Sequence, residues 1–392
     1  MTFISSPELN NFRGYIQNDG KVGVRNDLLI LNITGLTEAI AYRIGSGLNG
    51  AKVISFPYGL GLFGKDADIS LMVLRGLALN PNSGAVLVLS ADRNRLEEII
   101  QTLEIAGKPY KGIALDETGH DSLKMINMGL KAGAKLIRQL SKHSRNLVEL
   151  SSLCLGVECG HSDPTSGIVS NPLIGKITDR IVNAGGTVIM GETLEWLGVE
   201  DKLSARAVSK KIGQDIKNAV FRRENLAIKS GIDLLGKNPH RRNIEEGLTT
   251  IEEKASGSAS KSGSVVISGV LEYGEAPKSP GLWLMDAASY TPESLTGFAA
   301  SGAQMTILST GSGNCYTSKL MPTFQLTANS ETAKRLDCQI DFDCSSLMLG
   351  GDKIKVEEDL LKEILSIASG MFCYGEILGD GGETISRYGE SL

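Results

Sequence analysis

The sequence lacks the features that mark membrane, secreted and nucleic-acid-binding proteins. No apolar run approaches the roughly 20 residues of a membrane span, and residues 1–6 have neither the basic start nor the apolar core of a signal peptide. Lys and Arg number 40 against 45 Asp and Glu, for a net charge of −5. This balance gives no electrostatic reason to expect nucleic acid or an anionic membrane as a partner. We therefore expect a cytoplasmic protein.

Cysteine is scarce, and recognised nucleotide motifs are absent. Six cysteines in 392 residues are more typical of free thiols or ligands than of a disulfide framework. Cys154 and Cys159 are close in sequence, but C-x4-C-x-H supplies too few ligands for a structural zinc site. Cys338 and Cys344 alternate with apolar residues, which favours buried positions. No dinucleotide fingerprint and no Gly-x-Ser-x-Gly elbow is found, so we expect no nucleotide cofactor.

Apolar, β-rich runs alternate with amphipathic segments along most of the chain. That order predicts α/β domains of two or three layers with mostly parallel sheets covered by helices. A chain of 392 residues exceeds one compact core, so we divide it at residues 1–146 and 147–392. Residues 236–263 are rich in Asn, Pro, Gly and Ser and predict a linker or long loop. The predicted strands lie at residues 27–33, 51–56, 85–89, 112–115, 187–190, 264–270, 281–286, 305–309 and 323–327.

The segment from Cys159 to Gly167 has the composition of an active-site loop. It holds a thiol, an imidazole, three hydroxyls and a carboxylate, which together can bind a metal or a polyhydroxy acid, and its glycines let backbone N–H groups approach an anion. An apolar run, residues 153–157, precedes it and a helix-like segment, residues 171–184, follows. Ligand loops of α/β proteins lie at such strand-to-helix junctions. A solvated surface loop is the alternative.

Within this loop the side chains divide by chemistry. Cys159, His161 and Asp163 are the predicted metal ligands or acid–base cluster. An exposed loop histidine is the alternative for His161. The predicted hydrogen-bond donors to substrate hydroxyls or carboxylate are Ser162, Ser166 and Asn171.

Two glutamates follow the predicted strand 187–190. Glu192 and Glu195 lie three residues apart, so they can share one helical face and converge on a cleft. A carboxylate near a helix N-terminus is also favourable with the dipole alone, which is the alternative for Glu195. Glu192 is the predicted catalytic residue.

Other candidate substrate contacts lie far from this loop. Arg25 and Asn26 end a turn before the first strand, where the arginine could grip a carboxylate or tie the amino-terminal segment to the body. Asn238, Thr249 and Thr250 could close over substrate as a polar lid, or form an ordered linker with self-capping hydroxyls.

Several blocks together resemble the altronate and galactarate dehydratase family, and they span nearly the whole chain in the family's order. The blocks are residues 14–26, the loop from Cys159, residues 185–195, residues 238–250 and residues 274–277. The resemblance implies a lyase that eliminates water from a sugar acid, or sulfite in a related sulfolactate branch. It also implies a small hydroxy-acid substrate, a divalent metal such as Fe(II) or Mn(II), a homo-oligomer, and a separate small subunit carrying an amino-terminal domain.

Departures from the family pattern leave three hypotheses open. The family tends to place His and Cys where this chain has residues 58–64 and residues 90–92, and His161 stands where the family has glycine. The leading hypothesis is an altronate-type dehydratase that forms a 2-keto-3-deoxy acid. The alternatives are the large subunit of a sulfolactate sulfo-lyase, and a remodelled member that only binds a hydroxy acid or a partner subunit.

Overall fold

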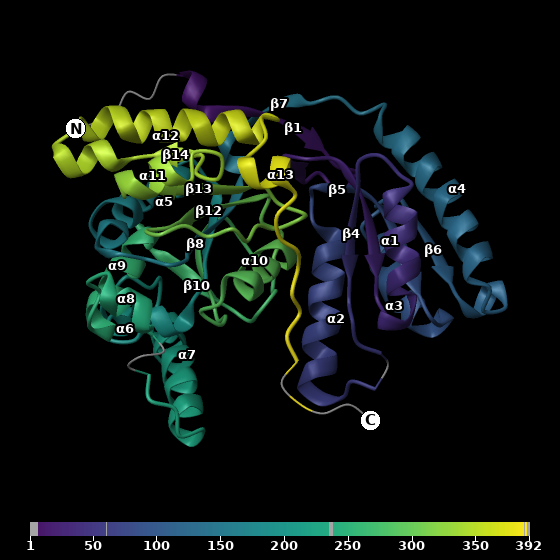
Figure 1. The fold of residues 1–392 in the computed structure, drawn as a ribbon, viewed down its shortest axis with the longest axis horizontal. Coiled ribbons are helices and arrows are strands. Elements are labelled where there is room, and N and C mark those ends of the chain that lie inside the picture. The colour runs from purple at the N-terminus through teal and green to yellow at the C-terminus, as the bar shows by residue number, and fades with distance from the viewer. Residues whose placement is uncertain (1–6, 60, 235–237, 388, 390–392) are drawn as a thin grey trace.

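The computed structural model describes residues 7–59, 61–234, 238–387 and 389. Two parallel sheets, of four and seven strands, form the body of the molecule, and a small antiparallel sheet joins them (Figure 1). The predicted fold class, α/β with mostly parallel sheets, is confirmed. In the part of the chain that is described, no helix is both long and apolar enough to cross a membrane.

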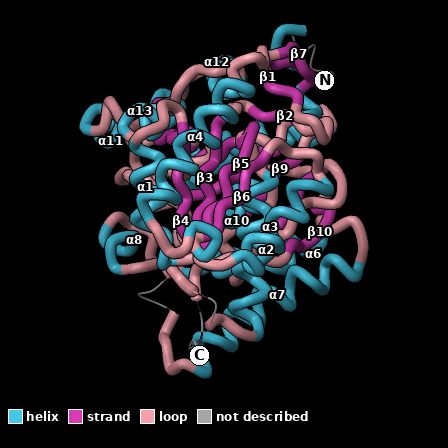
Figure 2. The backbone as a smooth tube through the Cα atoms, turned by 90° about the vertical axis from the view of Figure 1, so that its right-hand side faces the viewer, coloured by secondary structure: helices cyan, strands magenta, loops and turns pink. Residues whose placement is uncertain are grey.

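The four-stranded sheet has the order β4-β3-β5-β6 and lies in the centre of Figure 2 with helices around it. Its central strands are buried along nearly their whole length, as expected for continuous Val, Leu and Ile runs in a parallel sheet. Helices α1 and α4 cover one face, and α2 and α3 cover the other. The bounds are β3 Asp27–Asn32, β4 Ala51–Ser55, β5 Ser83–Ser90, β6 Tyr110–Ala114, α1 Glu38–Ser46, α2 Gly64–Leu79, α3 Arg93–Ile105 and α4 Ser122–Leu140.

The seven-stranded sheet has the order β10-β11-β9-β8-β12-β13-β14, and all its pairs are parallel. Helices α5 and α12 pack on one face and α10 on the other. The strands are β8 Cys154–Cys159, β9 Thr187–Met190, β10 Ile267–Leu271, β11 Gly281–Met285, β12 Met305–Ser309, β13 Thr323–Thr327 and β14 Phe342–Asp343. The helices are α5 Asn171–Asn183, α6 Glu200–Ala205, α7 Lys210–Lys229, α8 Arg241–Glu245, α9 Ile251–Ala259, α10 Thr291–Ala300, α11 Ser330–Arg335, α12 Lys353–Ala368 and α13 Tyr374–Leu378.

One hydrophobic cluster is shared by the two parallel sheets. Helices α2 and α10 pack against each other between them, with Phe298 fully buried. The carboxy-terminal segment runs down between these helices (Figure 1) and contributes Ile385 to the same cluster. Burial of this apolar surface fixes one sheet relative to the other.

A three-stranded antiparallel sheet, β2-β1-β7, was not predicted from the sequence. It is formed by β1 Asn11–Ile16, β2 Val22–Gly23 and β7 Asn146–Glu149. Phe12 pairs with Val148 in this sheet, so the chain's start is joined to the point where the second parallel unit begins.

Most predicted strands agree with the structure, and three, at residues 187–190, 305–309 and 323–327, have the predicted bounds. The expectation that Cys338 is buried is wrong, because it lies exposed in the turn between α11 and β14; Cys344 is buried. The segment 236–263 contains α8, α9 and a short 3-10 helix, Ser260–Ser262. The division at residues 146 and 147 stays a prediction.

Candidate functional site

The carboxyl ends of two neighbouring strands bring a thiol and a carboxylate together. Strand β8 ends at Cys159, and β9 beside it is followed by Gly191 and Glu192, with Val157 opposite Met190 in the register. Glu192 has φ of 67°, a left-handed conformation that costs a non-glycine residue on the order of 1 kcal/mol. Such strain is typical of functional positions.

Two carboxylates converge on the sulfur of Cys159. The Sγ atom lies 3.4 Å from Glu192 Oε2 and 3.1 Å from Glu195 Oε2. The backbone N–H of Cys159 also donates to Glu192 Oε2 at 3.1 Å. Glu195 is carried there by a 3-10 helix, Thr193–Trp196, and all three side chains are buried.

Two lysines complete the group, Lys261 fully buried and Lys254 partly buried, and both come from the segment 236–263. Lys261 Nζ lies 2.8 Å from Cys159 Sγ and 2.5 Å from Glu192 Oε2. Lys254 Nζ lies 2.9 Å from Glu195 Oε1. We call Cys159, Glu192, Glu195, Lys254 and Lys261 the Cys159 centre.

Helix α9 reaches the Cys159 centre through a close helix-to-loop contact. Thr250 caps the helix by accepting from the Glu253 N–H at 3.1 Å. A Cβ on Gly257 would lie 2.9 Å from the Cα of Gly167, so only glycine permits this approach. The helix therefore carries Lys254 and Ser258 to the cluster, with Ser258 Oγ 3.8 Å from Cys159 Sγ.

Burial and the ion pairs act in opposite directions on these groups. Burial, followed by Glu192 and Glu195, raises the pKa of Cys159 well above its usual value. Burial alone would lower the pKa of Lys261, but Cys159, Glu192 and Glu195 raise it well above its usual value. These causes keep Lys261 an ammonium ion.

The two glutamates differ in their pKa shifts although each contacts a lysine. Burial, followed by Glu195, raises the pKa of Glu192. Burial would also raise the pKa of Glu195, but Lys254 and Lys261 outweigh it and lower that pKa to about 2. Glu195 is therefore the permanent anion of the pair, and Glu192 is the carboxylate that is easier to protonate.

A further acid lies beside the centre. Glu158 is fully buried, and among the described residues its carboxyl group has no polar neighbour within hydrogen-bonding reach other than the Ser294 hydroxyl. Burial, followed by the charge of Glu192, raises its pKa well above the usual value. We assign it as an uncharged acid, because a buried carboxylate beside a second carboxylate would be strongly destabilising.

A small cavity of about 10 Å³, room for about one water molecule, adjoins the centre. Asn171 is buried at its wall, where Nδ2 donates to Gly257 O at 3.1 Å and Oδ1 has no partner. A larger hollow beside Lys176 contains none of the residues of the Cys159 centre. The small cavity is lined by Cys159, Ser162, Gly167, Asn171, Glu195, Leu248, Glu253, Lys254, Gly257 and Ser258.

Of the three predicted metal ligands, the structure brings only Cys159 into a ligand-like cluster. Among the described residues, Cys159, Glu192 and Glu195 form the group whose potential ligand atoms all lie within 4.8 Å of one another. His161 is exposed, with φ of 54°, and its Nδ1 donates to Gly313 O at 2.7 Å. Asp163 serves the loop itself, accepting from Thr165 Oγ1 at 2.7 Å and from the Ser166 N–H at 3.0 Å.

The predicted donors in this loop are divided between the cavity and the loop's own structure. Ser162 lines the cavity, and its carbonyl accepts from Asn243 Nδ2 at 2.7 Å. Ser166 Oγ instead donates to Asp163 Oδ1 at 3.2 Å. Ser162 and Asn171 are thus the two predicted donors that line the cavity.

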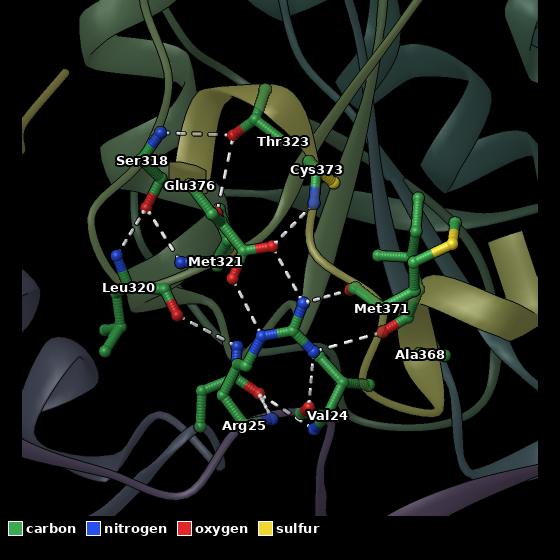
Figure 3. A network of polar contacts seen from close by, with 12 residues as sticks. Val24, Arg25, Ser318, Leu320, Met321, Thr323, Ala368, Met371, Cys373 and Glu376 are labelled. Carbon is green, nitrogen blue, oxygen red and sulfur yellow. Dashed lines mark hydrogen bonds and ion pairs between the residues drawn. The ribbon is translucent and has the colours of Figure 1, made fainter. Parts of the chain in front are cut away.

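Arg25 and Asn26 belong to another part of the molecule. Arg25 forms a bidentate ion pair with Glu376, 2.7 Å at each contact, and its other N–H groups donate to the carbonyls of Val24, Ile367 and Met371 (Figure 3). All five guanidinium N–H groups are used, so none is left for a substrate carboxylate. Asn26 Nδ2 points to Leu140 O at 3.4 Å. The contacts therefore support the second interpretation of Arg25, in which it ties the amino-terminal segment to the body of the protein.

The predicted lid residues also separate. Asn238 Oδ1 accepts from Lys254 Nζ at 2.5 Å and is therefore linked to the Cys159 centre. Thr249 is exposed and hydrogen-bonds Glu253, and Thr250 caps α9. For both threonines the contacts are those of self-capping hydroxyls.

Sequence reasoning missed Lys254, Ser258 and Lys261. Their spacing of i, i+4 and i+7 places them on one face of a helical segment, and this was the available signal. In a segment rich in Gly and Ser, however, lysines are typical of solvent-exposed linkers.

Comparison with known families matches both units of the chain. Residues 150–390 match the family described as D-galactarate/Altronate dehydratase, C-terminal. Residues 14–141 match the one described as D-galactarate dehydratase/Altronate hydrolase, second domain.

Individual relatives share about a third of their residues with this chain. The (2R)-sulfolactate sulfo-lyase subunit beta of Chromohalobacter salexigens is 33% identical over 384 residues, which cover 97% of this chain and 98% of the relative. The altronate dehydratase of Escherichia coli is 31% identical over 370 residues, 91% of this chain and 73% of the relative. The galactarate dehydratase (L-threo-forming) of Escherichia coli is 28% identical over 315 residues, which cover 78% of this chain and 60% of the relative.

Proposed function

The chain belongs to the D-galactarate/altronate dehydratase family, and we propose that it is a lyase that eliminates water from a sugar acid of the altronate type. The product is a 2-keto-3-deoxy acid. The observation that carries the proposal is the buried Cys159 centre at the carboxyl ends of β8 and β9, beside a small cavity. This edge is where ligands bind in open α/β sheets.

Elimination from a 2-hydroxy acid needs a base and a stabiliser of negative charge. The base removes the proton α to the carboxylate, and the C3–O bond breaks as the leaving hydroxyl takes a proton. We assign Glu192 as the base, since burial raises its pKa and a base with a pKa nearer to neutral is more effective. Lys261 and Lys254 supply positive charge for the substrate carboxylate as its charge increases.

The cavity wall and the other members of the centre have supporting roles. Ser162 Oγ and Asn171 Oδ1 are assigned to the substrate hydroxyls, because both residues line the cavity and the Asn171 oxygen lacks a partner. Glu195, held as an anion by Lys254, orients Lys254 and the Cys159 thiol. We assign His161, which lies exposed in the loop, as the general acid that protonates the leaving hydroxyl.

The Cys159 centre also has the donor set for a divalent metal. Cys159, Glu192 and Glu195 would hold the ion, so that Glu192 would be a ligand in the metal-bound form and the base in the metal-free form. Thiolate with carboxylate ligands suit Fe(II), Mn(II) or Zn(II). Bound there, it would act as a Lewis acid on the substrate's carboxylate and 2-hydroxyl.

Sulfite elimination is the second candidate. It is favoured by the end-to-end match with a protein named as a sulfo-lyase subunit beta, which covers 97% of this chain and 98% of the relative. Sulfite is a better leaving group than hydroxide, so it needs less help from a general acid. In this case we propose that the chain works with a small partner subunit.

A substrate panel tests these proposals. The anaerobically purified protein is assayed with and without Fe(II) and a candidate small subunit, on aldonates, aldarates and sulfolactate. Keto-acid release from a sugar acid supports the dehydratase, and sulfite release supports the sulfo-lyase. If no acid is turned over with the partner and metal present, the remaining hypothesis is a family member that only binds a hydroxy acid or a partner.

A further inference from the structure

We propose that Lys261 is a resident cation that competes with a divalent metal ion for Cys159 and Glu192. Metal binding at the Cys159 centre would then require the ammonium group to leave its present contacts. The inference deepens the proposed function, because it concerns control of metal loading at the same site. Its test measures binding alone and needs no turnover.

Lys261 contacts two of the three candidate ligand residues. Its Nζ lies 2.8 Å from Cys159 Sγ and 2.5 Å from Glu192 Oε2, and these side chains with Glu195 are the described group that could hold a metal. An ion bonded to the same two atoms would need the region that the ammonium occupies. Two cations at contact distance in a buried site repel strongly.

Lys261 is also held firmly in place. Its side chain is fully buried, and its carbonyl accepts from Thr178 Oγ1 at 2.8 Å. The ammonium therefore cannot turn to solvent without a rearrangement of the segment Ser260–Ser262. In the metal-free protein it replaces the charge that a metal would supply to the thiol and carboxylate.

Lys254 provides a matched comparison within the same centre. It is partly buried and also paired with a glutamate of the group, but its Nζ contacts Glu195 Oε1 at 2.9 Å, whereas Oε2 of Glu195 faces the sulfur. Its second partner is Asn238 Oδ1. Lys254 therefore leaves Cys159 Sγ and Glu192 Oε2 untouched, so its removal does not clear the metal position.

The experiment compares metal binding by the full-length wild type, Lys261→Met and Lys254→Met. After chelator treatment, each protein is titrated with Zn(II) and with Mn(II) by calorimetry at pH 7, and metal content as purified is measured by mass spectrometry. We expect Lys261→Met to bind one ion per chain at least about tenfold more tightly than the wild type. Lys254→Met should stay within about threefold of the wild type. Adding Cys159→Ser to Lys261→Met should abolish the gain.

Two results would overturn the inference: an equal affinity in the wild type and a folded Lys261→Met, or an equal gain in both lysine variants. Folding is checked by circular dichroism, and Lys261→Gln, which keeps a polar hydrogen-bonding end without the charge, carries the test if methionine is not accepted. Loss of turnover on every acid with the metal gain intact would defeat the proposed function and leave this inference standing. Turnover of an acid together with unchanged metal affinity in Lys261→Met would support the proposed function and defeat this inference.

Discussion

Two buried lysines, one in each parallel unit, experience opposite electrostatics. Lys108, beside the four-stranded sheet, donates to the carbonyls of Asn80 and Ser83 at 2.7 Å each, and burial lowers its pKa to about 7. Lys261 is at least as buried, yet contact with Cys159 and Glu192 raises its pKa well above the usual value. Burial disfavours both charges, and an anionic partner decides the sign of the net shift.

The carboxyl edges of the two sheets also differ in whether their polar groups are charged. At the four-stranded sheet, Asn32 Nδ2 donates to Ser55 Oγ at 2.9 Å and Asn32 Oδ1 accepts from Thr37 Oγ1 at 2.6 Å, a closed network of uncharged groups. At the seven-stranded sheet the same edge holds the charged Cys159 centre. Similar architecture therefore provides a scaffold in one unit and a candidate reactive site in the other.

Removing the proposed base, Glu192, is the strongest test of this difference between a reactive edge and a structural edge. We expect Glu192→Gln to lower kcat/KM by about 10³-fold, because the amide cannot accept the α-proton. Steady-state release of keto acid or sulfite measures the effect. An unimpaired variant would remove Glu192 from the mechanism.

The matched control lies at the other edge. Asn32→Ala should lower the free energy of unfolding by about 1–3 kcal/mol, since buried hydroxyls lose their partner, and leave turnover per folded molecule unchanged. A loss of kcat comparable to that of Glu192→Gln would break the comparison between the edges.

The next effect concerns the tie between Arg25 and Glu376. We expect Arg25→Met to lower the free energy of unfolding by about 3 kcal/mol, because the partly buried Glu376 loses its ion pair and keeps only the hydrogen bond from the Cys373 N–H. Urea unfolding measures this. Replacing both, as Arg25→Met with Glu376→Leu, should recover part of the loss. A raised KM without loss of stability would instead support the substrate-gripping role.

The lowered pKa of Lys108 should make the free energy of unfolding depend on pH. Its folded-state pKa of about 7 lies below the usual value of 10.5, so the unfolded chain binds more protons between these values. Its contribution to stability is therefore fully present above pH 10.5, and is lost as the pH falls from 10.5 to 7. The stability of the wild type relative to Lys108→Met should rise by up to about 5 kcal/mol as the pH rises over this window. A flat difference would show that Lys108 is solvated.

The sequence predicts the regular parts of this fold and only part of its site. Strand β9 and the glutamate that follows it are found because apolar runs and junctions have local signatures. The contact between Cys159 and Lys261 cannot be predicted in this way, because 102 positions separate the two residues. Only the tertiary fold brings α9, and Lys261 after it, to the loop. Arg25 shows the reverse limit: its chemistry fits a carboxylate, and folding decides that the carboxylate is Glu376.

The smallest effect separates a helix cap from a substrate contact. Thr250 Oγ1 accepts from the Glu253 N–H at 3.1 Å at the start of α9, so Thr250→Ala should lower the free energy of unfolding by about 1 kcal/mol. Thr250→Ser keeps the cap and is the control. Because α9 carries Lys254 to Glu195, kcat should fall only slightly while KM stays unchanged. A KM that rises in the alanine variant without any change in stability would return Thr250 to the polar lid, and would extend the reactive region from the strand edge to the start of α9.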